Sequence, residues 1–241
     1  MKQNKLIYIY FAILAIQLTG DYLFDLNGSA LGVWLTKPLL MPILAYWYYQ
    51  NTKAKTSFDK IILVSLFFSW WGDNFLMPGI FKTDINFLLG LASFLIAHVL
   101  YIVAFVKTPI KTKSVLLKRP WLVFPFVLFL FGMISFLFNQ KHPDFALMSI
   151  PVIVYATVIM IMVLTALNRY EKVNHPSFKW VFIGAVLFMI SDSVIAFQNF
   201  SYLFGENKLI ARFLIMPLYV LGQYFIAKGC ILQNANGNNQ I

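Results

Sequence analysis

Two acidic residues, Asp73 and Asp192, each lie well inside a long run of apolar residues. Inserting a carboxylate at such a depth costs at least about 2.5 kcal/mol, and such a group usually faces a bundle interior and has a function. Two buried carboxyls can divide into a protonated acid and an ionised base. The pattern therefore indicates acid–base chemistry. The alternative is that each carboxyl is a protonated hydrogen-bond donor in helix packing.

The two aspartates occupy matching positions along their predicted helices. Asp73 is fourteen residues after Asp59, and Asp192 is fourteen residues after Phe178. At a rise of about 1.5 Å per residue, each lies about 21 Å from the start of its helix. Both helices run in the same direction, so we predict that the two carboxyls share one depth in the outer half of the membrane. We further predict that they meet in one lipid-accessible cavity.

Further polar residues lie on the helix predicted between the aspartates, at residues 85–106. Asn86 and Tyr101 fall on one helical face together with small residues, and His98 lies at the edge of that face. A neutral imidazole near an aspartate could orient a carboxyl or a water molecule. The alternative is an ordinary hydrogen-bonded core histidine.

Two other helices carry candidate binding residues. Tyr219 and Gln223 share one face of the last predicted helix, where they could position water or an ether oxygen, or bond between helices. Lys37 lies within the second predicted helix and could hold a lipid phosphate, pair with an aspartate or extend to the interface. Asp21 and Asp25, near the outer end of the first helix, could line a site or lie at the interface.

The elements that must position these residues follow from composition. The chain has 241 residues, of which 60% are hydrophobic and only 12% charged. A soluble domain of this size needs far more charge to cover its surface. The chain has room for about eight spans of about 20 residues. We therefore predict an all-α polytopic membrane bundle, a single domain over residues 1–232, and a disordered polar tail over 233–241. The helices are predicted at residues 6–23, 31–49, 58–77, 85–106, 121–138, 145–167, 178–197 and 209–232.

The net charge of +10 does not indicate nucleic-acid binding, because the Lys and Arg residues lie between the apolar runs. One set of alternating loops holds fourteen of these cations, whereas the opposite set holds four. Positive loops stay in the cytoplasm, so both termini are predicted to be cytoplasmic and the number of helices even. The expected location is a plasma membrane or a bacterial inner membrane. The oligomeric state stays open.

The two aspartates also end similar segments, Ser-Trp-Trp-Gly-Asp at 69–73 and Phe-Met-Ile-Ser-Asp at 188–192. Two parallel four-helix halves would place them symmetrically. Other chemistries lack their signatures, since the chain has no Gly-x-Ser-x-Gly, His-Glu-x-x-His or Walker A motif. Its single cysteine, Cys230, excludes an intramolecular disulfide.

Five segments together resemble the YhhN family, which includes the animal lysoplasmalogenases. They are Thr-Lys-Pro-Leu at 36–39, Gly-Asp-Asn-Phe-Leu-Met at 72–77, Phe-Leu-Leu-Gly-Leu-Ala-Ser-Phe-Leu-Ile-Ala-His-Val-Leu-Tyr at 87–101, Ser-Asp-Ser at 191–193, and 219–227, which contains Leu-Gly-Gln-Tyr. Each segment alone is a weak signal, but their joint order and spacing are fairly specific.

The resemblance implies a hydrolase that cleaves the vinyl ether bond of a lysoplasmalogen into a fatty aldehyde and a glycerophospho-headgroup. It implies a lysophospholipid substrate and requires no metal or nucleotide. Asp73 and Asp192 would then be acid and base, in either order. His98, Tyr101, Tyr219 and Gln223 would orient water and the ether, Asn86 would join them in substrate binding, and Lys37 would meet the phosphate. A proton-coupled transporter or a lipid-binding membrane protein is the alternative, because carriers also bury acidic pairs.

Overall fold

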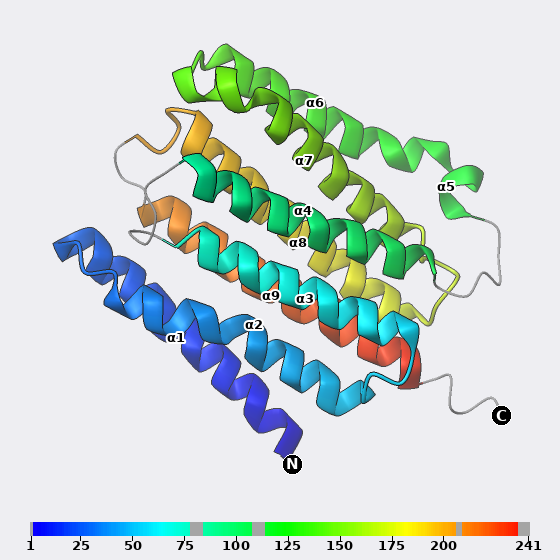
Figure 1. Ribbon diagram of the computed structural model, residues 1–241. Helices are drawn as coiled ribbons and strands as arrows, with labels where there is room; N and C mark the ends of the chain where they lie inside the picture. The colour runs from blue at the N-terminus through cyan, green and yellow to red at the C-terminus, as the bar shows by residue number, and fades with distance from the viewer. Residues whose placement is uncertain (1, 78–83, 108–113, 206–208, 236–241) are drawn as a thin grey trace. The chain divides into compact units, whose positions relative to one another are not determined.

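The computed structural model describes residues 2–77, 84–107, 114–205 and 209–235, and these residues are almost entirely helical (Figure 1). The long helices are α1 (Lys2–Asn27), α2 (Leu31–Thr52), α3 (Ser57–Phe75), α4 (Asp84–Val106), α6 (Phe124–Asn139), α7 (Pro143–Leu167), α8 (His175–Phe200) and α9 (Leu209–Ala235). Two short helices, α5 (Val115–Lys118) and η1 (Pro120–Val123), precede α6.

The prediction of an all-α membrane bundle is confirmed, and each predicted range overlaps a long helix, although the range 58–77 runs two residues past the end of α3. Among the described residues, six helical segments are long and apolar enough to cross a membrane, and they correspond to α1, α4, α6 with η1, α7, α8 and α9. The chain is therefore a multi-pass integral membrane protein. That α2 and α3 also cross, making eight crossings, stays a prediction.

The helix predicted from residue 121 begins with a 3₁₀ turn in the structure, and a proline lies at the start of this turn and another at the start of the α-helix. Residues Pro120–Val123 form a 3₁₀ turn, and the α-helix starts at Phe124 with Pro125 in its first turn. Proline has no N–H to donate and disfavours an α conformation in the residue before it. Arg119, the residue before Pro120, is not helical, at φ −138° and ψ 69°, so the helical segment starts at Pro120. Pro125 lies in the first turn of α6, where an N–H would have no partner within the helix.

The helices divide into two compact units, residues 1–104 with 234–241, and residues 105–233. The first unit holds α1 to α4 up to Ala104, and the second holds α5 through most of α9. Each unit thus contributes four long helices, and each candidate aspartate lies on the third of its unit. The predicted repeat has its boundary at the same place. The repeat itself and the single domain over residues 1–232 stay predictions.

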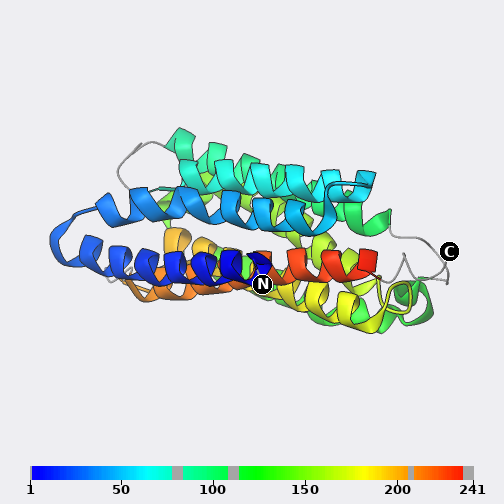
Figure 2. The same ribbon diagram turned by 90° about the horizontal axis from the view of Figure 1, so that it is seen from below.

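In the first unit, α1 and α2 form an antiparallel hairpin that the two views show side by side (Figures 1 and 2). The turn between them uses Gly28 in the left-handed region, at φ 72°. Gly20 and Gly32 let the two backbones touch, because a Cβ on Gly20 would lie only 2.9 Å from the Gly32 carbonyl carbon. Helix α3 then packs on α2.

Local signals explain where α3 starts and how α2 stays intact. Thr56 and Asp59 form a reciprocal capping box at the start of α3. Asp59 also accepts a 3.0 Å bond from the Tyr48 hydroxyl, which supports its capping role. Pro42 has no N–H for the Pro38 carbonyl one turn earlier, and the Trp70 indole N–H donates to that carbonyl instead, at 2.9 Å.

In the second unit, α6 and α7 form an antiparallel pair, and α8 packs on α7. The Ser191 hydroxyl fastens α8 to α9 by donating to the Ile215 carbonyl at 3.0 Å. Arg169, predicted in a cytoplasmic loop, is fully buried and donates to Ser177 Oγ at 3.1 Å and Gln233 Oε1 at 2.5 Å. Gln233, the first residue of the predicted tail, therefore belongs to α9.

Several residues used in the sequence predictions lie outside the described residues. Tail residues 236–241 are among them, as are four of the cations counted in the loops, Lys82, Lys111, Lys113 and Lys208.

Candidate functional site

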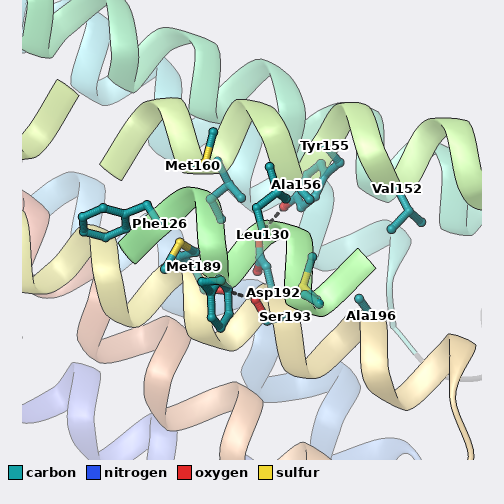
Figure 3. Close-up of a pocket in the computed structure, with 13 residues that line it drawn as sticks. Phe126, Leu130, Val152, Tyr155, Ala156, Met160, Met189, Asp192, Ser193 and Ala196 are labelled. Atoms are coloured by element: carbon teal, nitrogen blue, oxygen red, sulfur yellow. Dashed lines mark hydrogen bonds between the residues drawn. The ribbon is translucent and has the colours of Figure 1, made fainter. Parts of the chain in front are cut away.

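Asp192 lines a pocket within the second unit, between α6, α7 and α8 (Figure 3). Each helix contributes residues at spacings of three, four and seven, so one face of each helix lines the pocket. The polar lining residues are Tyr155, Asp192 and Ser193. The other ten are apolar: Phe126, Phe129, Leu130, Met133, Val152, Ala156, Ile159, Met160, Met189 and Ala196.

Tyr155 on α7 is the hydrogen-bond partner of Asp192 on α8. Its hydroxyl donates to Asp192 Oδ2, and both side chains are at most 8% exposed (Figure 3). A neutral donor to a carboxyl oxygen fixes the orientation of that carboxyl. Sequence reasoning did not find Tyr155, because its apolar neighbours make it look like a packing residue.

The pocket has room for water beside the carboxyl. Its cavity volume is about 30 Å³, and about 10–15 Å³ suffices for one water molecule. The lining residue Phe129 is 38% exposed, so the pocket borders the outer surface of α6. In a membrane helix an apolar outer surface faces lipid. The pocket therefore combines a buried carboxyl, room for water and a border with the lipid-facing surface.

Asp73 lies in the first unit and is 2% exposed. Tyr10 on α1 lies within electrostatic range of both Asp73 and Tyr101, so three helices bring these side chains together. Both tyrosines are fully buried. The structure thus places the predicted residue Tyr101 in the same cluster as Asp73, and it adds Tyr10. That Asp73 and Asp192 meet in one cavity stays a prediction.

The remaining candidates of the first unit differ in burial. His98 is fully buried and Asn86 is 7% exposed, both on α4. Lys37 is half-buried on α2 and follows Thr36, which is buried. The described contacts do not test their predicted roles in binding water or phosphate, which stay predictions.

The candidates on α9 are buried within the second unit. Tyr219 is 3% exposed, and its ring meets that of Phe188 edge-to-face at 5.2 Å between centroids. Gln223 is fully buried. Neither lines the α6–α7–α8 pocket. Phe188 precedes Asp192 by one helical turn, so Tyr219 packs against the helix segment that carries the aspartate.

A buried polar network joins α1 and α2 in the first unit. The Thr36 hydroxyl donates to Gln17 Oε1 and, at 2.6 Å, to the Gly32 carbonyl. Gln17 Nε2 donates to Asp21 Oδ2 at 3.3 Å. Asp21 is 4% exposed, so its carboxyl is buried in the first unit. Whether it lines a site or lies at the interface stays a prediction.

Within the part of the chain that the structure describes, no group of three or more His, Cys, Asp or Glu side chains could hold a metal ion.

Comparison with known proteins identifies the family. The model of the YhhN family matches residues 32–230, which contain both aspartates and the two other polar residues that line the pocket, Tyr155 and Ser193. The chain belongs to the YhhN family. This confirms the resemblance found in the five sequence segments.

A curated relative of this YhhN protein is a protein of Dictyostelium discoideum named "Lysoplasmalogenase homolog". It is 28% identical over 265 aligned residues, covering 92% of this chain and 84% of the relative. No solved structure matches this YhhN protein significantly. Family and relative together support membership of a hydrolase family.

Proposed function

We propose that this YhhN protein hydrolyses the vinyl ether bond of lysoplasmalogens, releasing a fatty aldehyde and a glycerophospho-headgroup. The observation that carries the proposal is Asp192, a buried carboxyl bonded to Tyr155 in an otherwise apolar pocket that borders the lipid-facing surface. The name of the Dictyostelium relative gives the substrate class. A lipid ether is an apolar substrate, and this pocket has an apolar lining.

The pocket contains what acid-catalysed hydrolysis of a vinyl ether needs. A protonated Asp192 gives its proton to the β carbon of the double bond, which leaves an oxocarbenium ion and a carboxylate. The carboxylate stabilises the cation and takes a proton from a water molecule as that water attacks. The resulting hemiacetal breaks its bond to the glycerol oxygen, which takes up the hydroxyl proton. The sum is one vinyl ether and one water giving one aldehyde and one alcohol.

Tyr155 holds the carboxyl in a fixed orientation by donating to Oδ2. The hydroxyl of Ser193 donates to the Met189 carbonyl at 2.8 Å. Its oxygen keeps lone pairs that can accept a hydrogen bond from the attacking water.

The steps above use Asp192, and Asp73 is proposed as a second carboxyl that takes either the acid or the base role. Lys37 is proposed to meet the lipid phosphate. Asn86, His98, Tyr101, Tyr219 and Gln223 are proposed to orient the substrate and water, as the family resemblance implies. The reaction as proposed uses no metal or nucleotide.

The orientation in the membrane is also a proposal. The excess of Lys and Arg in one set of loops supports cytoplasmic termini and a plasma or bacterial inner membrane. Asp192 would then lie toward the outer side, because α8 starts from the cytoplasmic side.

The test incubates purified protein in detergent with three lysolipids of equal chain length and headgroup: a vinyl ether, a saturated alkyl ether and an acyl ester. We expect free aldehyde from the vinyl ether alone. Asp192→Asn should lower the rate at least about 100-fold, since a general acid contributes about 10²–10⁴-fold. Asp73→Asn tests the second carboxyl in the same assay. Wild-type protein that is folded and yields no aldehyde would contradict the proposal.

A proton-coupled transporter is the second candidate, and the buried series on α1 supports it. Tyr10, Gln17 and Asp21 are all at most 4% exposed and lie on one helical face, at spacings of seven and four. Buried polar series of this kind occur in proton relays. Proton uptake by sealed proteoliposomes on lysolipid addition, without aldehyde, would favour the transporter.

A further inference from the structure

Helix α6 is the least buried wall of the pocket around Asp192. Only Met133 and Leu137 of its sixteen residues are buried, whereas α7 buries nine of twenty-five and α8 buries ten of twenty-six. Most of the other α6 side chains are exposed, and an exposed apolar side chain of a membrane helix faces lipid. On this side of the pocket, a single helix therefore separates the carboxyl from the lipid.

The contacts that hold α6 in place are apolar. Its only polar side chains, Ser135 and Asn139, are both exposed. Three ring pairs with centroids 5.0–6.4 Å apart join α6 to α7 and α8: Phe126–Phe182, Phe136–Phe197 and Phe138–Phe145. Lipid tails are as apolar as these rings, so an apolar helix surface that is displaced within a membrane loses packing but is not transferred to water. Displacing α6 therefore costs less than displacing a helix that hydrogen bonds hold in place.

The other two walls belong to a fixed frame of α7, α8 and α9. Helix α7 is bonded to α8 through the Tyr155 hydroxyl and Asp192. Helix α8 is bonded to α9 by Ser191, which donates to an α9 carbonyl at 3.0 Å. The backbones of α8 and α9 also touch, because a Cβ on Gly184 would lie 2.6 Å from the Gly222 carbonyl oxygen. A change that enlarges the pocket therefore comes from α6.

The pocket has to enlarge before it can take a lipid. Its cavity volume is about 30 Å³, which is room for about two water molecules and far less than a hydrocarbon chain needs. Helix α6 supplies four of the lining residues: Phe126, Phe129, Leu130 and Met133. Phe129 is also exposed on the outer surface. Displacing this face of α6 therefore connects the carboxyl directly with the surrounding lipid.

The backbone at both ends of η1 and α6 allows the two to be displaced together. Arg119, before η1, is not helical, at φ −138° and ψ 69°. Lys141, between α6 and α7, lies in the left-handed region at φ 51°. Torsions at the ends of elements absorb a displacement, so α6 can move without losing its own helical hydrogen bonds.

From these contacts we infer that α6 is the movable wall of the pocket, and that its displacement admits a single-chain lipid to Asp192 sideways from the membrane. The inference rests on the proposed function for the kind of lipid, and it adds the route by which that lipid enters. The entering hydrocarbon chain replaces the apolar contacts that α6 makes with the frame, so the frame stays covered by apolar groups throughout.

Distances between spin labels test the displacement without turnover. Leu128→Cys on α6 and Ile190→Cys on α8 carry the labels at two exposed positions, in protein whose buried Cys230 is replaced by Ala. The control pair combines Ile190→Cys with Val154→Cys, at an exposed position of α7. The ligand is a saturated alkyl ether lysolipid with a long chain, which has no vinyl ether to cleave. Its binding is followed by the rise in the thermal unfolding midpoint.

The two label pairs should respond differently to the bound lipid. Carbon atoms pack about 3.5–4.0 Å apart, so one inserted chain should lengthen the distance between Leu128 and Ile190 by about 4 Å. The distance between Val154 and Ile190 should stay the same. A lipid that binds and leaves both distances unchanged overturns the inference. Equal changes in both pairs also overturn it, because the frame would then be moving.

A reversible crosslink tests whether turnover needs the displacement. Phe136→Cys with Phe197→Cys joins α6 to α8 where the native ring centroids are 5.5 Å apart. Tyr170→Cys with Phe178→Cys is the matched control, since those rings are 5.1 Å apart and lie at the α7–α8 connection of the frame. Both pairs are bridged by a short bis-thiosulfonate reagent. We expect the α6 bridge to lower aldehyde release at least about tenfold, since a wall that gates entry limits the rate. Dithiothreitol should restore the rate, and the control bridge should leave it near the unbridged value.

The two readouts separate this inference from the proposed function. If the lipid lengthens the distance between Leu128 and Ile190 while wild-type protein releases no aldehyde, the function is wrong and the movable wall stands. If aldehyde forms at the same rate with and without the α6 bridge, the lipid does not enter past α6 and the function stands.

Discussion

Replacing Tyr155 by Phe tests whether the bond to Asp192 matters for turnover. The change removes only the hydroxyl that donates to Oδ2, and the ring keeps its place against the buried faces of α7 and α8. A hydrogen bond to a charged group is worth about 1.5–3 kcal/mol. With about 1.36 kcal/mol per factor of ten, losing that energy in the transition state lowers kcat about 10- to 150-fold.

The assay is the release of aldehyde from a lysoplasmalogen at saturating and limiting substrate. Tyr155 orients the carboxyl and has no proposed contact with the lipid substrate. We therefore expect kcat to fall and KM to change little. Tyr46→Phe is the control, since Tyr46 is 53% exposed on α2, and it should retain wild-type rates.

A double variant sharpens the test. If Tyr155 acts through Asp192, then Tyr155→Phe should cost nothing further in an Asp192→Asn background, because groups that act as a unit are not additive. A folded Tyr155→Phe protein with kcat within twofold of wild type would refute the positioning role. Additive losses would show instead that Tyr155 acts independently of the carboxyl.

Three further outcomes follow from packing, hydrogen bonding and charge. Gly184→Ala should lower the thermal unfolding midpoint, because the added Cβ would lie 2.6 Å from the Gly222 carbonyl oxygen on α9, whereas Gly132→Ala, with nothing within 4 Å, should not. Equal midpoints for the two variants would contradict the close packing. Trp70→Phe should destabilise the protein by about 1–3 kcal/mol, because the Pro38 carbonyl loses its donor; guanidinium unfolding measures this, and a change below about 0.5 kcal/mol would show that the bond is dispensable. A reporter that is active only in the cytoplasm should be active when fused to the C-terminus, and one that is active only in the periplasm should be inactive there. The opposite result would show that the predicted membrane orientation is wrong.

The sequence determined the helices and the membrane environment, because both depend on local composition. Long apolar runs broken by polar loops predict spanning helices from length alone. The same runs made Asp73 and Asp192 conspicuous, since a buried acid contrasts with its neighbours. The structure confirms that both are buried. The prediction of one helix from residue 121 missed the 3₁₀ turn before α6, because apolar composition does not distinguish a 3₁₀ turn from an α-helical turn.

Only the tertiary structure decided which side chains meet these acids. Tyr155 is thirty-seven residues from Asp192, and its contact depends on how α7 and α8 are rotated against each other. The same holds for the bond from Thr36 to Gln17. Hydrophobic periodicity gives no rotation for a helix that is apolar on every side. In such helices the faces toward a pocket, toward another helix and toward lipid have the same composition. Only the packing of the helices in the tertiary structure shows which face is which.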